Sequence, residues 1–140
     1  MTHYGILCPG TTGPLNTMLP LGQELQKRGH RVTLCGEIDI QSKVQAAGIE
    51  FIALSEKEFP PGYTAKLSTE LGELRGLAAL KYTVGMLRDM AAVKLRDAPG
   101  LLKEAGVEGL IVNQGSIEGG TVADIMDIPF VTVCSALVLN

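Results

Sequence analysis

Short apolar segments alternate along the chain with longer segments of helical period. Five apolar runs are too short for helices and are bounded by glycine, proline or polar residues, at positions 6–8, 31–35, 49–54, 110–113 and 128–134. Such runs are typical of parallel strands buried on both faces. Helical spacing occurs between them, at 15–28, 40–47 and 121–126, and Gly29 and Gly48 each follow such a segment as helix-ending residues. The pattern predicts a Rossmann-like three-layer α/β/α fold with a parallel five-stranded sheet in the order 3-2-1-4-5.

One segment is long for a plain connection between two strands. Helical period runs from residue 64 to residue 105, between the third and fourth predicted strands. Three glycines weaken the pattern and favour two helices or one bent helix, and Pro99-Gly100 is expected to break it. We expect residues 1–140 to form a single domain in which this helical insertion at 64–105 walls a pocket.

The turn after the first strand is the first candidate for chemistry. Gly10 and Gly13 give the backbone freedom there, and Pro14 suits a first helical position because its missing N–H is not needed. Unpaired N–H groups and the helix dipole attract an anion or a polar ligand atom. In the predicted strand order, the loop at 113–120 faces this turn across a crevice.

A ligand in the crevice would contact both loops. The predicted binding residues are Gly10, Thr11, Thr12, Gly13, Asn16, Asn113, Gln114 and Glu118. For Thr11, Thr12 and Asn16, local hydrogen bonding in the turn explains the residue type equally well.

Composition narrows the classes of partner. Hydrophobic residues make up 46% of the chain and charged residues 19%, which is typical of a folded domain rather than a disordered one. The net charge of −3, without a cluster of Lys or Arg, argues against nucleic acid or an anionic membrane as a partner. No apolar run approaches the ~20 residues of a transmembrane helix, and no signal peptide is evident. We therefore expect a cytoplasmic chain without a transmembrane segment.

The three cysteines each fall at the end of a predicted strand, at Cys8, Cys35 and Cys134. Their odd number and wide spacing argue against a metal site and favour small buried hydrophobic side chains. The alternative is that they converge at one sheet edge, where they could be oxidised.

A dinucleotide site is one interpretation of the crevice. Gly10 and Gly13 follow a strand and open a helix, and Glu37 follows the second strand, where an acid could bind a ribose. The motif G-x-G-x-x-G is absent, so the backbone cannot approach a pyrophosphate in the usual way. The sequence disfavours this interpretation.

Two longer runs carry a resemblance to a known family. The first is CPGTTGPLNTMLPL at 8–21, followed by RGHRVTL at 28–34, and the second is GGTVAD at 119–124, followed by IPFVTV at 128–133. Together they resemble the N-terminal part of a two-domain (GT-B) UDP-glycosyltransferase, family 1-like, and are especially similar to the branch that glycosylates the carotenoid zeaxanthin in bacteria.

This resemblance implies a division of labour between two domains. The N-terminal domain binds the acceptor, and a C-terminal donor domain, absent from this chain, binds the UDP-sugar. The leucine-rich insertion suggests that the acceptor is a small hydrophobic alcohol, although amphipathic packing explains these leucines equally well. The chain itself is then expected to hold no cofactor and no metal. The implied reaction is a direct inverting displacement in which a base removes the acceptor's hydroxyl proton.

The family's base is a His in the first loop, oriented by an Asp after the fourth strand, and this sequence departs from it at both positions. The matching residues are Pro14 and Asn113, which can neither take a proton nor stabilise an imidazolium. Glu118 in the facing loop is a candidate base, and its alternative role is that of a solvated loop acid or a charge at a helix start. His3 lies at the terminus, and a structural role is expected for His30 before the second strand.

Three interpretations stay open at this point. In the first, another residue, for example Glu118, has taken over as the base. In the second, the acceptor needs little help from a base or receives it from the missing half. In the third, the chain is a non-catalytic ligand-binding or interaction domain derived from such an enzyme. The abrupt apolar ending at 135–140 suggests part of a longer protein. Surface intended for the missing half would be exposed, which is compatible with a homodimer or aggregation. We expect no transferase activity from this chain alone.

Overall fold

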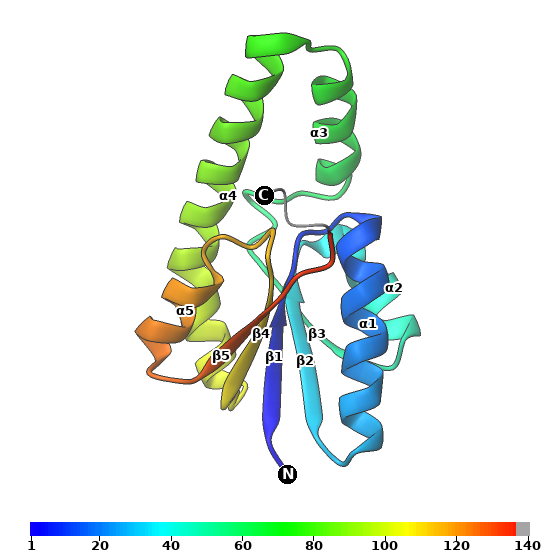
Figure 1. Ribbon diagram of the computed structural model, residues 1–140, viewed down its shortest axis with the longest axis vertical. Coiled ribbons are helices and arrows are strands. Elements are labelled where there is room, and N and C mark those ends of the chain that lie inside the picture. Colours follow the sequence, from blue (N-terminus) through cyan, green and yellow to red (C-terminus); the bar gives the residue numbers. More distant parts are fainter. Residues whose placement is uncertain (137–140) are drawn as a thin grey trace.

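Five parallel strands form one sheet in the order β3-β2-β1-β4-β5 in the computed structural model, which describes residues 1–136 (Figure 1). The strands are β1 (His3–Leu7), β2 (Arg31–Gly36), β3 (Glu50–Ala53), β4 (Gly109–Asn113) and β5 (Phe130–Val133). In the centre, Ile6 of β1 lies opposite Leu34 of β2 and Ile111 of β4. The predicted fold class and strand order are confirmed. The end of the chain at 137–140 lies outside the described residues.

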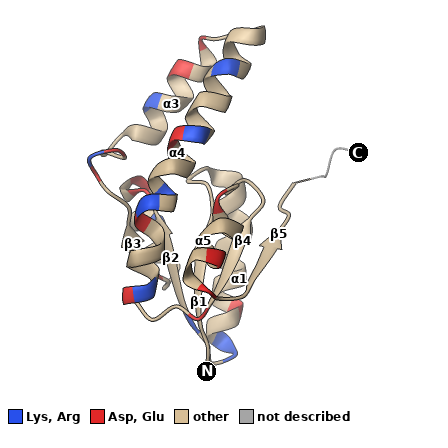
Figure 2. Ribbon diagram, turned by 90° about the vertical axis from the view of Figure 1, so that its left-hand side faces the viewer, with Lys and Arg blue, Asp and Glu red and all other residues tan. Residues whose placement is uncertain are grey.

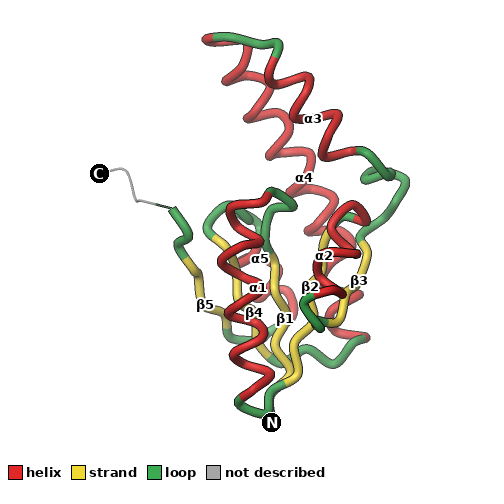
Figure 3. The backbone as a smooth tube through the Cα atoms, turned by 90° about the vertical axis from the view of Figure 1, so that its right-hand side faces the viewer, coloured by secondary structure: helices red, strands yellow, loops and turns green. Residues whose placement is uncertain are grey.

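Helices cover both faces of the sheet (Figures 1 and 3). Helices α1 (Thr12–Lys27) and α2 (Gln41–Ala46) lie on one face, and a 3-10 turn at Ile38–Ile40 precedes α2. Helix α5 (Gly119–Met126) and the C-terminal half of α4 (Gly76–Glu104) lie on the other face. The strand side chains alternate between two cores, because successive residues of a strand point to opposite faces. Ile6 belongs to the core under α1, and Leu7 belongs to the core under α4 and α5.

The first helix begins earlier than the sequence indicates. It starts at Thr12, so Pro14 is its third residue and not its first. Pro14 still lies in the first turn, where N–H groups have no partner within the helix, so its ring is tolerated. The helix ends as predicted, with Gly29 at a φ of 87° directly after the capping residue Arg28.

The expected break at Pro99-Gly100 is wrong, because α4 continues through both residues to Glu104. A proline inside a helix costs about 3 kcal/mol. Its neighbours Ala98 and Leu102 are completely buried in the core under α4. Burying these apolar side chains favours a continuous helix and offsets the lost backbone hydrogen bond.

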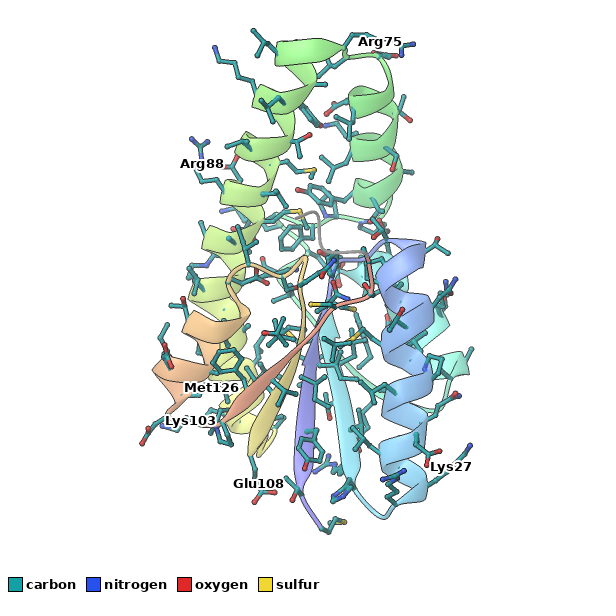
Figure 4. All side chains as sticks on the ribbon, viewed as in Figure 1. Lys27, Arg75, Arg88, Lys103, Glu108 and Met126 are labelled. Atoms are coloured by element: carbon teal, nitrogen blue, oxygen red, sulfur yellow. The ribbon has the colours of Figure 1, made fainter. Side chains whose placement is uncertain are left out.

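The helical insertion consists of two helices, α3 (Tyr63–Gly72) and the N-terminal half of α4, which project beyond the carboxyl edge of the sheet (Figures 1 and 2). Arg75 lies at the far tip of this helical pair, and Arg88 points outward from α4 (Figure 4). The buried residues of α4, Lys94, Ala98 and Leu102, all lie in its second half and follow one another at intervals of four. That spacing places them on one face of the helix, against the sheet.

The close packing of α5 on the sheet depends on Gly119. A Cβ atom at this position would lie 2.1 Å from Cγ1 of Val112 in β4, so only glycine allows this approach. The last strand is shorter than the predicted 128–134 and lies at the sheet edge, where Phe130 and Val131 are exposed.

The cysteines only partly follow the prediction. Cys8 and Cys35 are buried and free, but Cys134 is exposed because it follows the edge strand. Cys8 and Cys35 both lie at the carboxyl ends of the neighbouring strands β1 and β2, but their side chains enter cores on opposite faces of the sheet.

Candidate functional site

A cavity of about 160 Å³ opens at the carboxyl edge of the sheet, below the α3–α4 pair. Residues of both predicted loops line it, Pro9, Gly10 and Thr11 from one and Gly115, Ile117 and Glu118 from the other. The loops are in direct contact, because a Cβ atom at Gly115 would lie 2.7 Å from Cγ of Pro9. Ligands of open α/β sheets bind at this edge, outside the carboxyl ends of neighbouring strands.

The wall formed by the helical pair is mainly apolar. Its apolar side chains are Leu67 and Leu71 from α3 and Met86, Leu87 and Met90 from α4, and Tyr63, Thr64 and Ser68 of α3 add hydroxyl groups. The sequence predicts that methionines at helical spacing are ordinary core residues. Met18 is such a residue, because its side chain has no exposed surface. Met86 and Met90 line the cavity, and Met90 also packs against the core under α4 and α5. Flexible apolar side chains of this kind adapt to the shape of a ligand.

The opposite end of the cavity is charged and buried. Nζ of Lys94 lies 3.7 Å from Oε1 of Glu37 and 3.6 Å from Oε1 of Glu118. These three residues, the Glu37–Lys94–Glu118 cluster, expose only 2–5% of their surface, and all three line the cavity. They come from three places in the chain: the residue after β2, the middle of α4 and the loop before α5. Lys94 was not singled out from the sequence.

The two carboxylates of the cluster stabilise the positive charge of Lys94. Burial lowers the pKa of Lys94, but the carboxylates of Glu37 and Glu118 together raise it above its ordinary value, so the ammonium stays charged. Burial raises the pKa of the neighbouring thiols of Cys8 and Cys35 to about 12, so both remain neutral near pH 7. The pKa of Tyr63 is also raised, mainly by burial and then by Glu37. Two carboxylates and one ammonium give this end of the cavity a formal charge of −1.

The carboxylate oxygens of the cluster have room for further hydrogen bonds. Within residues 1–136, both oxygens of Glu37 and Oε1 of Glu118 are buried without a hydrogen-bond partner. Buried acceptors of this kind are rare, because an unpartnered polar group costs about 1–3 kcal/mol. Gly10 adjoins them, since a Cβ atom there would lie 3.0 Å from Oε2 of Glu37.

Of the eight predicted binding residues, three line the cavity, namely Gly10, Thr11 and Glu118. Glu118 is buried and so is not a solvated loop acid, but it directly precedes α5 and therefore also lies at a helix start. Thr12 lines an adjoining shallow depression with Asp39 and Lys43. The others are absent from the cavity wall: Gly13, Asn16 and Gln114 are exposed, and Asn16 accepts a hydrogen bond from Lys43 at 3.5 Å.

The two positions that match the family's catalytic pair lie outside the cavity. Asn113 is buried at the end of β4 and holds the following loop, accepting a hydrogen bond from the Gly115 N–H at 3.0 Å and donating one to Ser135 at 2.8 Å. Pro14 is in the first turn of α1. Both histidines lie at the opposite edge of the sheet, where Nδ1 of His30 accepts from the Thr2 N–H and His3 contacts Thr33. This placement agrees with the structural role expected for His30.

Glu37 follows β2, as the dinucleotide interpretation requires, but the loop after β1 lacks the G-x-G-x-x-G turn that would hold a pyrophosphate. The carboxylate of Glu37 is 2% exposed and is paired with Lys94. Among residues 1–136, no group of three His, Cys, Asp or Glu is arranged to hold a metal ion. No helix in that part of the chain is long and apolar enough to cross a bilayer.

A second apolar depression lies away from these loops, between α1 and the sheet edge. It is lined by Tyr4, Leu21 and Leu25 and by the exposed strand residues Phe130 and Val131. It contains none of the charged residues of the cluster.

Asp39 fixes the wall of the cavity to the sheet. Its carboxylate accepts hydrogen bonds from the N–H groups of Gly62, at 2.8 Å, and Thr64, at 3.0 Å, at the start of α3. The Thr64 bond first, and then the Gly62 bond, hold the pKa of Asp39 below its ordinary value.

We expect Asp39→Ala to lower the free energy of unfolding at pH 7 by about 1 kcal/mol, as loss of a helix cap does. Because the pKa is lower in the folded chain, this contribution is present above the unfolded pKa of about 3.9 and is lost as the pH falls through the folded value. Urea unfolding of both proteins at pH 7 and near pH 3 measures it, with the exposed Asp124→Ala as control. If Asp39→Ala lowers the free energy of unfolding equally at both pH values, the hydrogen bonds do not lower the pKa of Asp39 as stated.

Solved structures define the class of this fold. The calicheamicin glycosyltransferase CalG4 superposes with a TM-score of 0.78 on 100% of this chain and 34% of its own, at 20% identity. The kitacinnamycin glycotransferase superposes with a TM-score of 0.76 on 98% of this chain and 31% of its own, at 19% identity. The chain thus has the architecture of one half of a GT-B glycosyltransferase.

Sequence comparison adds particular relatives, although no family model matches the chain. The zeaxanthin glucosyltransferases of Pantoea ananas and Pseudescherichia vulneris are 31% and 25% identical to it, in each case over 100% of this chain and 32% of their own length. A sterol 3-beta-glucosyltransferase of Eremothecium gossypii is 24% identical over 91% of this chain and 10% of its own. The chain is therefore related to the bacterial zeaxanthin glucosyltransferases, spans about a third of their length and corresponds to their N-terminal domain.

Proposed function

We propose that this chain is the acceptor-binding part of a UDP-sugar-dependent glycosyltransferase that acts on a small hydrophobic alcohol. One observation carries the proposal: the cavity is apolar along α3 and α4 and acidic at its buried end. Such a cavity suits a hydrocarbon body that ends in a hydroxyl group. The names of the relatives, which act on zeaxanthin and on a sterol, support the same class of acceptor.

The size of the cavity indicates how such an acceptor would lie. A volume of about 160 Å³ accommodates one end of a long hydrocarbon molecule rather than all of it. The hydroxyl-bearing end would enter, because the buried end of the cavity holds carboxylate oxygens without hydrogen-bond partners. The remainder of the molecule would extend along the wall formed by Met86, Leu87 and Met90.

Glu118 is our candidate for the base. In the proposed step, the hydroxyl proton passes to a Glu118 carboxylate oxygen while the acceptor oxygen bonds to the anomeric carbon of the sugar. The bond from that carbon to UDP breaks, and its electron pair leaves with UDP. A positioned base contributes about 10²–10⁴-fold to such a reaction.

The test uses the chain with all-trans-retinol as a polyene alcohol and with UDP-glucose. We expect retinol to bind, with an increase in its fluorescence, and we expect neither binding of UDP-glucose nor formation of a retinyl glucoside by this chain alone. Absence of retinol binding would contradict the proposal. UDP-glucose-dependent glucoside formation by the chain alone would contradict the division of labour on which it depends.

A further inference from the structure

The buried end of the cavity has a composition that an apolar alcohol site does not require. A single carboxylate or a serine would suffice to hold one hydroxyl group. Here two carboxylates share one ammonium, and all three groups are at least nine-tenths buried. Their separations of 3.6 Å and 3.7 Å are ion-pair distances, longer than hydrogen bonds.

The unpartnered atoms of the cluster are acceptors. Both oxygens of Glu37 and Oε1 of Glu118 lack hydrogen-bond partners within residues 1–136. An ionised carboxylate can only accept hydrogen bonds, so the group that completes the cluster must donate them. A ligand oxygen without a hydrogen would leave these acceptors unsatisfied.

The charge of the cluster favours the same kind of group. Two carboxylates and one ammonium give it a formal charge of −1, and the neutral thiols of Cys8 and Cys35 add no charge. An uncompensated charge away from water is costly, so a ligand group that brings positive charge or a hydrogen-bond donor is favoured. The nearby apolar wall from α3 and α4 strengthens this electrostatic preference by excluding water.

We infer that the Glu37–Lys94–Glu118 cluster selects the terminal group of the acceptor: it takes a hydroxyl or a protonated amine and rejects an ether. This inference rests on the proposed function, because it assumes that the apolar end of a ligand occupies the cavity. It assigns specificity to Glu37 and Lys94 as well as to Glu118. Lys94 has a positioning role, since it holds the two carboxylates in place without being the group that meets the acceptor's proton.

Three ligands with one hydrocarbon body test the selection: retinol, retinylamine and retinyl methyl ether. A hydrogen bond to a charged group contributes about 1.5–3 kcal/mol, so retinol should bind at least about tenfold more tightly than its methyl ether. Retinylamine should bind more tightly than retinol, because its protonated amine neutralises the cluster. Dissociation constants from ligand fluorescence give both ratios.

The variant Glu118→Gln identifies the residues responsible. It leaves Lys94 paired with Glu37 and brings the net charge of the cluster to zero, so retinylamine should lose its advantage over retinol. Glu56→Gln is the matched control, because it makes the same change at an exposed position and should leave all three affinities unchanged. Circular dichroism and urea unfolding show whether each variant is folded.

The outcomes separate this inference from the proposed function. Equal binding of all three ligands, unchanged in Glu118→Gln, would overturn the selection by the cluster and leave an apolar acceptor site standing. Absence of binding by all three ligands would overturn both. Preference for the amine that persists in Glu118→Gln would also contradict the inference, because the excess negative charge would then lie elsewhere.

Discussion

Replacing Lys94 with methionine will lower the free energy of unfolding by about 3–5 kcal/mol, the penalty for breaking a buried ion pair by removing one partner. The side chain is 3% exposed and is the one cation paired with Glu37 and Glu118 within residues 1–136. Without it, two carboxylates share a buried space with no opposite charge. Methionine fills a similar volume, so the effect reports charge rather than packing. Urea unfolding at pH 7 measures it.

A neutral version of the cluster provides the decisive comparison. The triple variant Lys94→Met, Glu37→Gln and Glu118→Gln removes every charge and should recover most of the lost stability, because no buried charge then lacks a partner. Lys27→Met, at a position where the side chain is 75% exposed, should change stability by less than about 0.5 kcal/mol. If Lys94→Met costs no more than Lys27→Met, the carboxylates are not held as a buried charged cluster.

Replacing Leu71 with tryptophan will weaken retinol binding by at least about tenfold, or about 1.4 kcal/mol. Leu71 lines the cavity from α3 and is absent from the two buried cores, so a larger side chain there occupies ligand space without disturbing the fold. The sequence contains no tryptophan, so the fluorescence of the new indole also reports on the site directly. Energy transfer from the indole to residual bound retinol would show their proximity.

Leu77→Trp is the matched control for this variant. Leu77 lies on the same helical pair, at the start of α4, but is 80% exposed and is not part of the cavity wall. The Leu77→Trp variant should bind retinol with the same affinity as the unsubstituted chain. Equal loss of affinity in both variants would place the ligand outside the cavity or show that bulky residues disturb the helical pair as a whole.

Much of the fold could be predicted because local signals and tertiary structure agree. Short apolar runs such as that at Ile6 and helix-ending glycines such as Gly29 determine the alternation of strands and helices, and parallel strands connected by helices have few topologies. The prediction failed at Pro99, where the burial of Ala98 and Leu102 outweighs the local preference to end the helix. A local signal cannot show what will pack against it.

The site was only partly predictable for a similar reason. The facing loops followed from the strand order, but the cluster requires three distant segments to meet. Glu118 was proposed as a base, and Glu37 only as a ribose ligand in an interpretation that the sequence disfavours. A signal for Lys94 was present: it lies four residues before Ala98 and eight before Leu102, so a lysine occupies the buried face of an amphipathic helix. Lysines are rarely buried unless paired, so this position indicated a buried carboxylate partner.

The central claim is that an apolar alcohol occupies the cavity between the two loops and the α3–α4 pair. The most direct measurement is NMR of methionine methyl groups, labelled with ¹³C, during titration with retinol. Met86 and Met90 line the cavity, whereas Met18 belongs to α1 and is buried in the core, and Met126 lies on α5 (Figure 4). We predict that the Met86 and Met90 signals shift with retinol concentration while those of Met18 and Met126 do not. Binding that leaves Met86 and Met90 unchanged, and instead perturbs the depression beside Phe130 and Val131, would contradict the account.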